Sequence, residues 1–357
     1  MSYSTNDIET LEYPVCVQRR SGMYLGEPSS ALGEPGQANV CVREILDNST
    51  TEGIKGCASH IVMRLKSDGT VVIEDNGRGI PVDRDRETGI TGIEKCMASL
   101  HSGGAFEHKA GEKVGSSLNG VGGACVNALS ESFIVEVIRK GRIYTETFEN
   151  GYVKDKMHSR KLAENDEANW LLGKDFDHSD TSMNVDPTSG TRVTFKLNKD
   201  FLSPVDSIVP DDIIKRLKYT VYMVDGLTID VYDDTRTVED GGGHQHFTND
   251  GGVPGMLENI STGDAIVKGN DEKLSKSGVF SVSTTGHYKE MATVVKNGRT
   301  TVKEQRMTVP IDIALRFSDS ENTDIRSFAN TIQTFSGGVH EDAFKRAIVD
   351  AFGKLAR

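Results

Sequence analysis

The spacing of hydrophobic and polar residues predicts alternating helices and strands along most of the 357-residue chain. Between 37 and 55, apolar residues recur every three or four positions, the period of a helix with one buried face. Between 60 and 75, apolar and polar residues alternate on either side of an Asp-Gly pair, which is typical of a β-hairpin. The same criteria predict helices over 91–100, 121–130, 211–224 and 341–355, and strands over 133–140, 142–150, 190–198, 227–234, 279–284, 288–296 and 303–316.

Four polar or glycine-rich segments interrupt this pattern, and we expect them to be irregular. Residues 1–20 should form a loose arm, 101–120 a long loop, and 151–189 an irregular surface. A long loop within a compact domain is usually functional or disordered. The glycine-rich stretch 235–252 is also loop-like and marks the expected boundary between two domains, a number that the length of the chain accommodates.

Composition and charge narrow the class of protein. Hydrophobic residues make up 36% and charged residues 26% of the chain, as in ordinary soluble globular proteins. The formal net charge is −12, whereas a free-standing nucleic-acid-binding domain is usually basic, so work on DNA would need a partner. The five cysteines are scattered without a C-x-x-C pair, and no stretch reaches ~18 apolar residues. We therefore expect a cytoplasmic protein in a reducing compartment, without a membrane partner.

A carboxylate and a carboxamide share one face of the helix predicted over 37–55. Glu44 and Asn48 are four positions apart, so both side chains point from the same side. The pair suits a base that activates water beside an oxygen ligand for Mg²⁺. Taken alone, such a pair is more often a solvated polar helix face.

Two glycine-rich motifs follow in the sequence. Asp75 ends an apolar strand and begins Asp-Asn-Gly-Arg-Gly-Ile-Pro, where a carboxylate can accept a hydrogen bond from an exocyclic amine and glycines admit a flat ring. Residues 115–123 run into the helix predicted over 121–130, and backbone N–H groups at such a start form an anion site. The loop lacks the Gly-Lys-Ser/Thr of a Walker A motif and does not follow directly on a strand, which disfavours dinucleotide binding. Alone, these motifs also fit a simple turn and a flexible linker.

The order of the three motifs is similar to that of the GHKL ATPases, which include gyrase, Hsp90, MutL and the histidine kinases. In that family a helix with E-x-x-x-N precedes a strand with D-x-G-x-G, a loop and a helix that opens on glycines. The resemblance implies an α+β fold: a GHKL (Bergerat) α/β sandwich with a mixed sheet, followed by a partial transducer α/β domain. It also implies ATP and Mg²⁺ as cofactors.

Longer matches narrow the resemblance to type IIA topoisomerases, and in particular to the amino-terminal region of gyrase B. The matching segments lie at 20–26, 44–52, 75–81, 100–104 and 126–130. The first reads Arg-Ser-Gly-Met-Tyr-Leu-Gly, which resembles the R-P-G-M-Y-I-G of gyrase B, and Gly-Gly-Val-His at 337–340 looks like the G-G-T-H of the transducer domain. The resemblance implies a dimerisation arm over 1–20, a GHKL ATP-binding domain over 21–234 and a transducer domain over 235–357.

The resemblance also assigns a role to individual residues. Glu44 would be the general base that activates the attacking water, and Asn48 would bind Mg²⁺ between the phosphates. Asp75 would accept a hydrogen bond from the adenine amino group, with help from Thr191. The other residues expected at ATP line the adenine pocket or offer backbone N–H groups to the phosphates: Gly77, Gly79, Ile80, Pro81, Asn119, Gly120, Val121 and Gly122.

Three further residues are expected around the mouth of the pocket. Arg139 would lie at the mouth itself. Glu52 and Arg78 would form an ion pair beside the adenine, which is a geometric prediction that a structure can test.

The sequence departs from the gyrase pattern at several places. Val40 stands where bacterial gyrase has a histidine that orients the general base, and Ala105 replaces a lysine near the phosphates. The transducer's Q-T-K loop has only one near match, at 333–335, and it precedes 337–340 instead of following it. We therefore expect the chain to stop before that loop and to hydrolyse ATP slowly by itself.

The implied function is that of the ATP-binding and hydrolysing part of an ATP-dependent type II DNA topoisomerase, in which ATP-driven dimerisation gates the passage of a DNA strand. The chain would form a homodimer with ATP and act on double-stranded DNA with a DNA-cleavage subunit of the gyrase A type. Two alternatives stay open: a GHKL-fold nucleotide-binding module without topoisomerase activity, and a MutL-like repair ATPase. The segment 20–26 favours a topoisomerase over a MutL-like protein.

Overall fold

The computed structural model describes residues 9–102, 120–162, 189–249, 251–269, 274–296 and 299–357. Contacts between residues divide the chain into two compact units, Met1–Asn249 and Asp250–Arg357. Most of the loop expected over 101–120 lies outside the described residues, as do the first eight residues of the expected arm.

The first unit is built on an eight-stranded sheet. Its strands in chain order are β1 (His60–Leu65), β2 (Thr70–Asp75), β3 (Ser130–Arg139), β4 (Arg142–Glu149), β5 (Tyr152–Lys161), β6 (Gly190–Leu197), β7 (Thr228–Asp233) and β8 (Gly243–Phe247). Their order across the sheet is β5-β4-β3-β6-β2-β1-β7-β8. Strands β1 and β7 pair in parallel, and the other described neighbours pair antiparallel. The sheet is therefore mixed, as expected.

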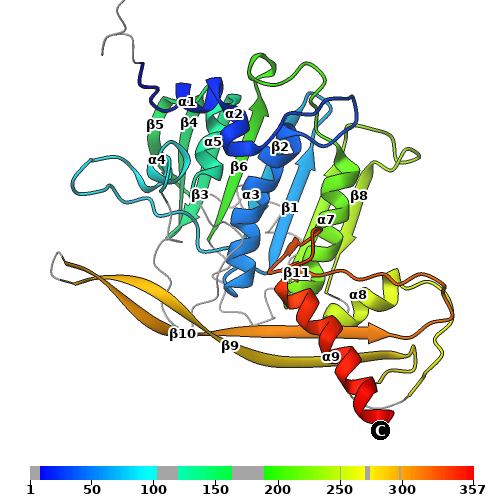
Figure 1. Cartoon of the computed structure of the whole chain (residues 1–357). Coiled ribbons are helices and arrows are strands. Elements are labelled where there is room, and N and C mark those ends of the chain that lie inside the picture. Colours follow the sequence, from blue (N-terminus) through cyan, green and yellow to red (C-terminus); the bar gives the residue numbers. More distant parts are fainter. Residues whose placement is uncertain (1–8, 103–119, 163–188, 250, 270–273, 297–298) are drawn as a thin grey trace, which may run out of the picture. The chain divides into compact units, whose positions relative to one another are not determined.

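Helices cover one face of this sheet (Figure 1). They are α1 (Val15–Arg19), α2 (Ser21–Leu25), α3 (Gln37–Ile54), α4 (Gly92–Met97), α5 (Gly122–Ala128) and α7 (Pro210–Met223), with a 3-10 helix at Lys199–Phe201. The long helix α3 contacts β1 and β2, α5 contacts β3, and α7 contacts β7. A proline in its first turn, followed by Asp211 and Asp212, starts α7, as the fixed φ of proline and the helix dipole favour.

The core of the first unit lies between these helices and the sheet. Successive side chains of a strand point to opposite faces, so every second residue of the central strands is apolar and buried. Phe133, Phe148 and Phe195 are the largest of these, and the Phe133 ring centroid lies 6.1 Å from that of Phe148 and 6.2 Å from that of Phe195. Full burial of each such ring stabilises the fold by ~1.5–3 kcal/mol. This packing holds the strands against the helices that cover them.

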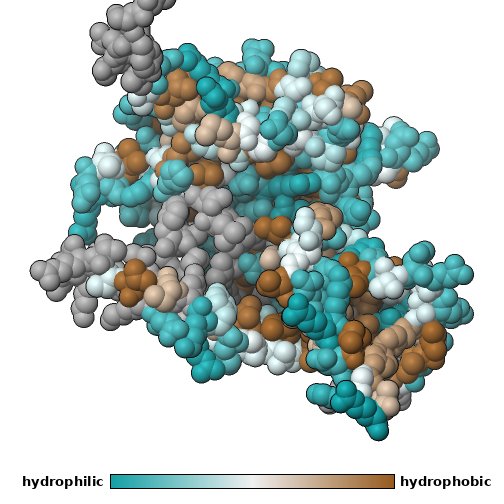
Figure 2. Space-filling view, viewed as in Figure 1, coloured by the Kyte–Doolittle hydropathy of each residue, from teal (hydrophilic) through white to brown (hydrophobic). Residues whose placement is uncertain are grey.

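The second unit is dominated by a long hairpin. Strands β9 (Val279–Lys296) and β10 (Arg299–Arg316) pair antiparallel along their whole length. Helix α8 (Gly252–Ile260), the short strands β11 (Phe328–Ala329) and β12 (Ile332–Gln333), and helix α9 (Val339–Leu355) complete the unit. Figure 2 shows hydrophobic residues on the surface of this unit, where Val349 and Leu355 of α9 are exposed.

Three segments expected to be irregular contain regular structure. Within 1–20, α1 forms and buries Val17 in the core. Within 151–189 lies β5, and within 235–252 lies β8. Strands β5 and β8 are the two edges of the sheet. An edge strand has a partner on one side only, and polar or charged residues are common there, so their sequences show little alternation.

The helices and strands that the sequence predicts lie near their expected positions, with two differences in extent, whereas α2, α8, β11 and β12 were not predicted. Because β8 pairs with β7, the first unit continues to Asn249, which lies within the expected boundary stretch 235–252 but beyond the domain limit of 234. The strands expected at 279–284 and 288–296 are one strand, since Gly286 keeps its pairing with Val309. Among the described helices, none has the length and apolarity that a bilayer crossing requires.

Candidate functional site

Helix α3 carries the first group of expected site residues, and contacts from distant parts of the chain fix its position. At its amino-terminal end, Asp206 accepts a hydrogen bond from the backbone N–H of Gln37 at 2.9 Å. Near its centre, Arg216 of α7 donates to Asp47 at 2.6 Å. These two contacts with charged residues fix the position of α3, and with it the positions of the side chains on its other faces.

The carboxylate of Glu44 projects from α3 onto the start of α5. A Cβ added to Gly122 would collide with Oε2 of Glu44, so a residue larger than glycine would displace the carboxylate. Burial raises the pKa of Glu44, and the charge of Asp47 adds to this effect while Arg216 opposes it. A carboxylate with a raised pKa is a stronger general base.

The start of α5 is formed by glycines and has no described side-chain cap. The helix begins at Gly122, with Val121 as its N-cap. Gly120 has a φ of +60°, which glycine adopts without strain. The first N–H groups of a helix lack partners within the helix and favour negative groups. An anion bound there would lie beside Glu44. Asn119, which is also expected at ATP, falls outside the described residues.

Asp75 at the end of β2 is a buried carboxyl group with several donors. Its Oδ2 accepts from Oγ of Ser49 at 2.8 Å, and its Oδ1 accepts from the N–H of Gly77 at 3.0 Å. Thr191 lies directly opposite on β6 and donates a backbone hydrogen bond. Burial raises the pKa of Asp75 to about 6, although these hydrogen bonds oppose the rise.

The glycines after Asp75 allow close packing of the backbone. A Cβ on Gly77 would lie 3.0 Å from Cβ and Cγ of Glu52, which is too close. Gly79 has a φ of +72°, and a Cβ there would lie 2.9 Å from Cγ1 of Val137 and 3.1 Å from Cγ of Arg139. Both glycines therefore pack against protein atoms, Gly77 against Glu52 of α3 and Gly79 against Val137 and Arg139 of β3.

The expected ion pair between Glu52 and Arg78 is confirmed. Arg78 donates from Nε to Oε2 of Glu52 at 2.8 Å and from Nη2 to Oε1 at 2.6 Å, which is the two-pronged geometry of a guanidinium on a carboxylate. Burial would raise the pKa of Glu52, but the hydrogen bonds and charge of Arg78 outweigh it and hold the pKa below its usual value. The pair joins the second half of α3 to the Asp75 loop.

The other expected residues surround the same part of α3. Asn48 follows Glu44 by one turn, and both are half-buried. Ile80 packs at the margin of the core while Pro81 is exposed, and Arg139 ends β3 beside the loop. The arrangement places the buried carboxyl group of Asp75 at one end, and the carboxylate of Glu44 next to the first residue of α5 at the other.

Comparison with known proteins assigns the family. Residues 33–200 match the family described as histidine kinase-, DNA gyrase B- and HSP90-like ATPase, and residues 264–357 match the family described as DNA gyrase B. The chain is 32% identical to the DNA gyrase B protein of Thermotoga maritima over 99% of its own length. This chain belongs to the DNA gyrase B family.

Other members of the gyrase B family match along the whole chain. Identity is 32% with the DNA gyrase B protein of Thermus thermophilus and 29% with the B subunit of DNA topoisomerase 4 of Staphylococcus aureus, over 100% of this chain in both. The chain spans about half the length of these relatives, 47% and 44% respectively.

A solved structure of the gyrase B family resembles this chain as well. It is the crystal structure of the 43K ATPase domain of Thermus thermophilus gyrase B in complex with an aminocoumarin. The TM-score is 0.66 at 26% identity, and the match covers 95% of this chain and 72% of that one. The similarity therefore extends over both compact units of the chain.

Three polar residues of this gyrase B-like site were not predicted from the sequence. Ser49 donates to Asp75, Ser189 donates from Oγ to the carbonyl of Gly77 at 2.8 Å, and Asn76 accepts from the N–H of Ser59 at 2.9 Å. Ser49 precedes Glu52 by one turn and lies on the same face of α3, so helical spacing could have identified it from the sequence. Ser189 had no such signal, because its contact joins residues 112 positions apart.

Proposed function

We propose that this chain binds and hydrolyses ATP as the ATPase part of a type II DNA topoisomerase. The observation that carries the proposal is the contact between the carboxylate of Glu44 and the glycine start of α5. A general base at this position would stand beside an anion site and could take a proton from a water next to a bound phosphate. The family assignment supports ATP as the occupant.

The adenine base would bind at Asp75. A carboxylate there can accept from an exocyclic amine. A residue larger than glycine at 77 or 79 would displace Glu52 or Val137, so the glycines keep the backbone next to Asp75 in its place. Thr191 pairs opposite Asp75 and would complete the polar edge, while Ile80 and Pro81 would form the apolar wall. The ion pair of Glu52 and Arg78 would hold the loop in this shape, and Arg139 would stand at the mouth of the pocket.

The phosphates would bind at the start of α5. Backbone N–H groups of Gly120, Val121 and Gly122 would donate to phosphate oxygens, and Glu44 would take a proton from the attacking water. The carboxamide oxygen of Asn48 is a hard ligand of the kind that Mg²⁺ prefers, and it lies one turn from Glu44. Mg²⁺ held by Asn48 and the phosphates would neutralise negative charge during hydrolysis.

At the level of the whole protein, we propose a homodimer that closes when ATP binds and gates the passage of double-stranded DNA. The net charge of −12 argues that most DNA binding falls to a partner. We propose a DNA-cleavage subunit of the gyrase A type as that partner. The unit Asp250–Arg357 would act as the transducer, which the gyrase B match over 264–357 supports. The five free thiols of the chain suit the reducing cytoplasm.

The test combines the purified chain with the DNA-cleavage subunit of its own source and supercoiled or relaxed plasmid, with ATP and without. We expect an ATP-dependent change in DNA topology, and dimers of the chain by sedimentation with a non-hydrolysable ATP analogue. An ATP-binding chain that neither dimerises nor changes topology in this mixture would instead be a nucleotide-binding module without topoisomerase work.

A further inference from the structure

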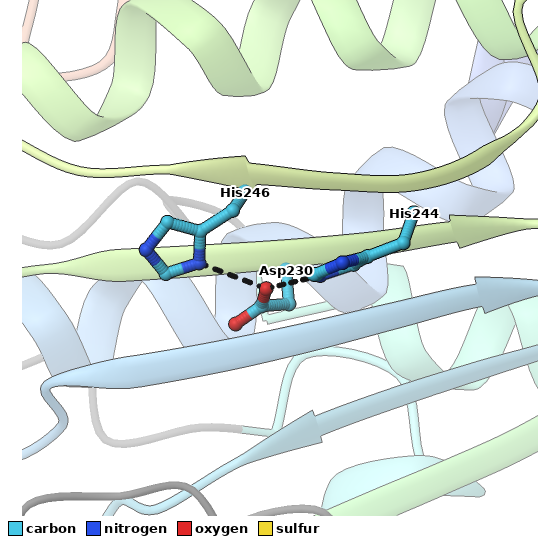
Figure 3. A group of neighbouring side chains, drawn as sticks. All are labelled: Asp230, His244 and His246. Carbon is cyan, nitrogen blue, oxygen red and sulfur yellow. Dashed lines mark hydrogen bonds and ion pairs between the residues drawn. The ribbon is translucent and has the colours of Figure 1, made fainter.

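Three histidines surround one aspartate at the β8 edge of the sheet, on strands other than those that carry the expected ATP site. His60 lies on β1, Asp230 on β7, and His244 and His246 on β8. Figure 3 shows the rings of His244 and His246 pointing toward the carboxylate of Asp230 from opposite sides. Ile229 is buried in the core, so by strand alternation Asp230 points to the face away from the helices.

The contacts within this cluster are short and directed. Oδ1 of Asp230 lies 2.6 Å from Nε2 of His244 and 2.9 Å from Nδ1 of His246. Its Oδ2 lies 2.6 Å from Nε2 of His60. The two oxygens thus have different partners: one faces the edge strand, and the other is held from within the sheet.

Strand pairing brings the four residues together. His244 and His246 are two positions apart on β8, so both point to the same face. His246 lies directly opposite Asp230, and His244 lies opposite Tyr232. The Tyr232 ring stacks on the His244 ring, with centroids 4.4 Å apart and planes 15° apart, which turns His244 toward Asp230.

The cluster is buried on one side and open on the other. Asp230 is 8% exposed and His60 is 7% exposed, whereas the side chains of His244 and His246 are 48% and 53% exposed. A cation could reach the site from solvent, and water could complete its coordination. The buried half would keep the carboxylate in one orientation.

The donor set is that of a transition-metal site. Two imidazoles and one carboxylate suit Zn²⁺ and its neighbours, whereas Mg²⁺ and Ca²⁺ prefer oxygen ligands alone. The three ligand atoms of Asp230, His244 and His246 lie within 4.8 Å of one another. Ligand atoms around tetrahedral Zn²⁺ lie roughly 3.3 Å apart, given bonds of about 2.0–2.1 Å. To admit the ion, each ring nitrogen would move roughly 0.4–0.7 Å away from Oδ1 of Asp230. The two ring nitrogens, which lie within 4.8 Å of each other, would settle at about 3.3 Å.

We propose that Asp230, His244 and His246 bind one Zn²⁺ ion, with water as the fourth ligand, and that His60 positions the carboxylate. The ion replaces the protons that the two exposed histidines share with Oδ1. It ties the edge strand β8 to β7 immediately before the first compact unit ends at Asn249. Zn²⁺ therefore stabilises the segment that leads from the ATP-binding unit to the next one, independently of ATP.

The test uses the full chain, prepared without a histidine tag and freed of metal with a chelator. Zn²⁺ alone is titrated into it while calorimetry measures the heat of binding, and the unfolding temperature is measured with and without Zn²⁺. We expect one saturable site and a higher unfolding temperature with Zn²⁺. The double variant His244→Gln, His246→Gln should bind Zn²⁺ at least ~100-fold more weakly, because it loses two of three ligands. The control His158→Gln changes an exposed histidine of β5 and should bind as the wild type does.

Two further outcomes decide the roles within the cluster. Co²⁺ bound to the wild type should give the visible absorption of a tetrahedral nitrogen and oxygen site, and the double variant should lack it. His60→Gln should weaken Zn²⁺ binding by ~10–100-fold while leaving the Co²⁺ spectrum in place, as expected of a positioning residue. Equal Zn²⁺ affinity in wild type and double variant, or no saturable binding by the wild type, would overturn the proposal.

Discussion

Replacing Asp75 by asparagine should change how the stability of the free protein depends on pH. Asp75 is buried, with only 5% of its surface exposed, and burial raises its pKa from the usual 3.8 to about 6. Asparagine keeps the size and can still accept from the N–H of Gly77, but it carries no ionisable proton. The comparison of the two proteins therefore isolates the cost of ionising one buried carboxyl group.

The magnitude follows from the two pKa values. They differ by about two pH units, and each unit corresponds to 1.36 kcal/mol, so the effect is about 3 kcal/mol. Because the folded pKa lies above the unfolded one, the contribution is fully present below about pH 4 and is lost as the pH rises to 6 and beyond. Relative to the wild type, Asp75→Asn should therefore gain about 3 kcal/mol of stability between pH 4 and pH 7.

The assay is urea unfolding followed by circular dichroism at pH values from 4 to 8, without nucleotide. Asp155→Asn, at an exposed position of β5, is the matched control for the same change of side chain outside the core. A difference between wild type and Asp75→Asn that stays constant over this range would show that Asp75 is ionised throughout, and the reasoning about its burial would be wrong.

Two more substitutions test the packing around the site. Gly122→Ala adds a Cβ that collides with Glu44. It should lower the free energy of chemical unfolding by ~1–3 kcal/mol and also slow ATP hydrolysis. In the control Gly22→Ala, the added Cβ has no described atom within 4 Å, so stability and hydrolysis should stay unchanged or stability should rise slightly. Arg78→Ala removes the partner of Glu52, but Arg78 is 57% exposed, so thermal unfolding should reveal a loss of at most ~1 kcal/mol. A large loss for Gly22→Ala, or several kcal/mol for Arg78→Ala, would contradict this description of the packing.

The parts of the site that the sequence predicted are local or carried by short motifs. Helical spacing in 37–55 was enough to place Glu44 and Asn48 on one face of α3. The segment that begins at Asp75 could be recognised because glycines at fixed positions directly after a strand are typical of few kinds of site. The ion pair of Glu52 with Arg78 followed from the family resemblance and is confirmed.

The parts that were missed depend on contacts between distant residues. Strands β5 and β8 lie at the sheet edges, where polar side chains are tolerated and hydrophobic alternation is weak. For the same reason the cluster around Asp230 was not predicted: its members come from three strands, and the two β8 histidines lie in a stretch that was expected to be a loop. Val17 was missed because a single buried residue on a five-residue helix leaves no period to detect.

The central claim is that Glu44 activates water for the hydrolysis of ATP bound at α3 and α5. The most direct test measures ATP binding and steady-state hydrolysis by the wild type and by Glu44→Gln, which keeps the size of the side chain but cannot act as a base. We predict that ATP affinity stays within about threefold, while kcat falls ~10²–10⁴-fold, the usual contribution of a general base. Hydrolysis by Glu44→Gln at the wild-type rate would contradict the account.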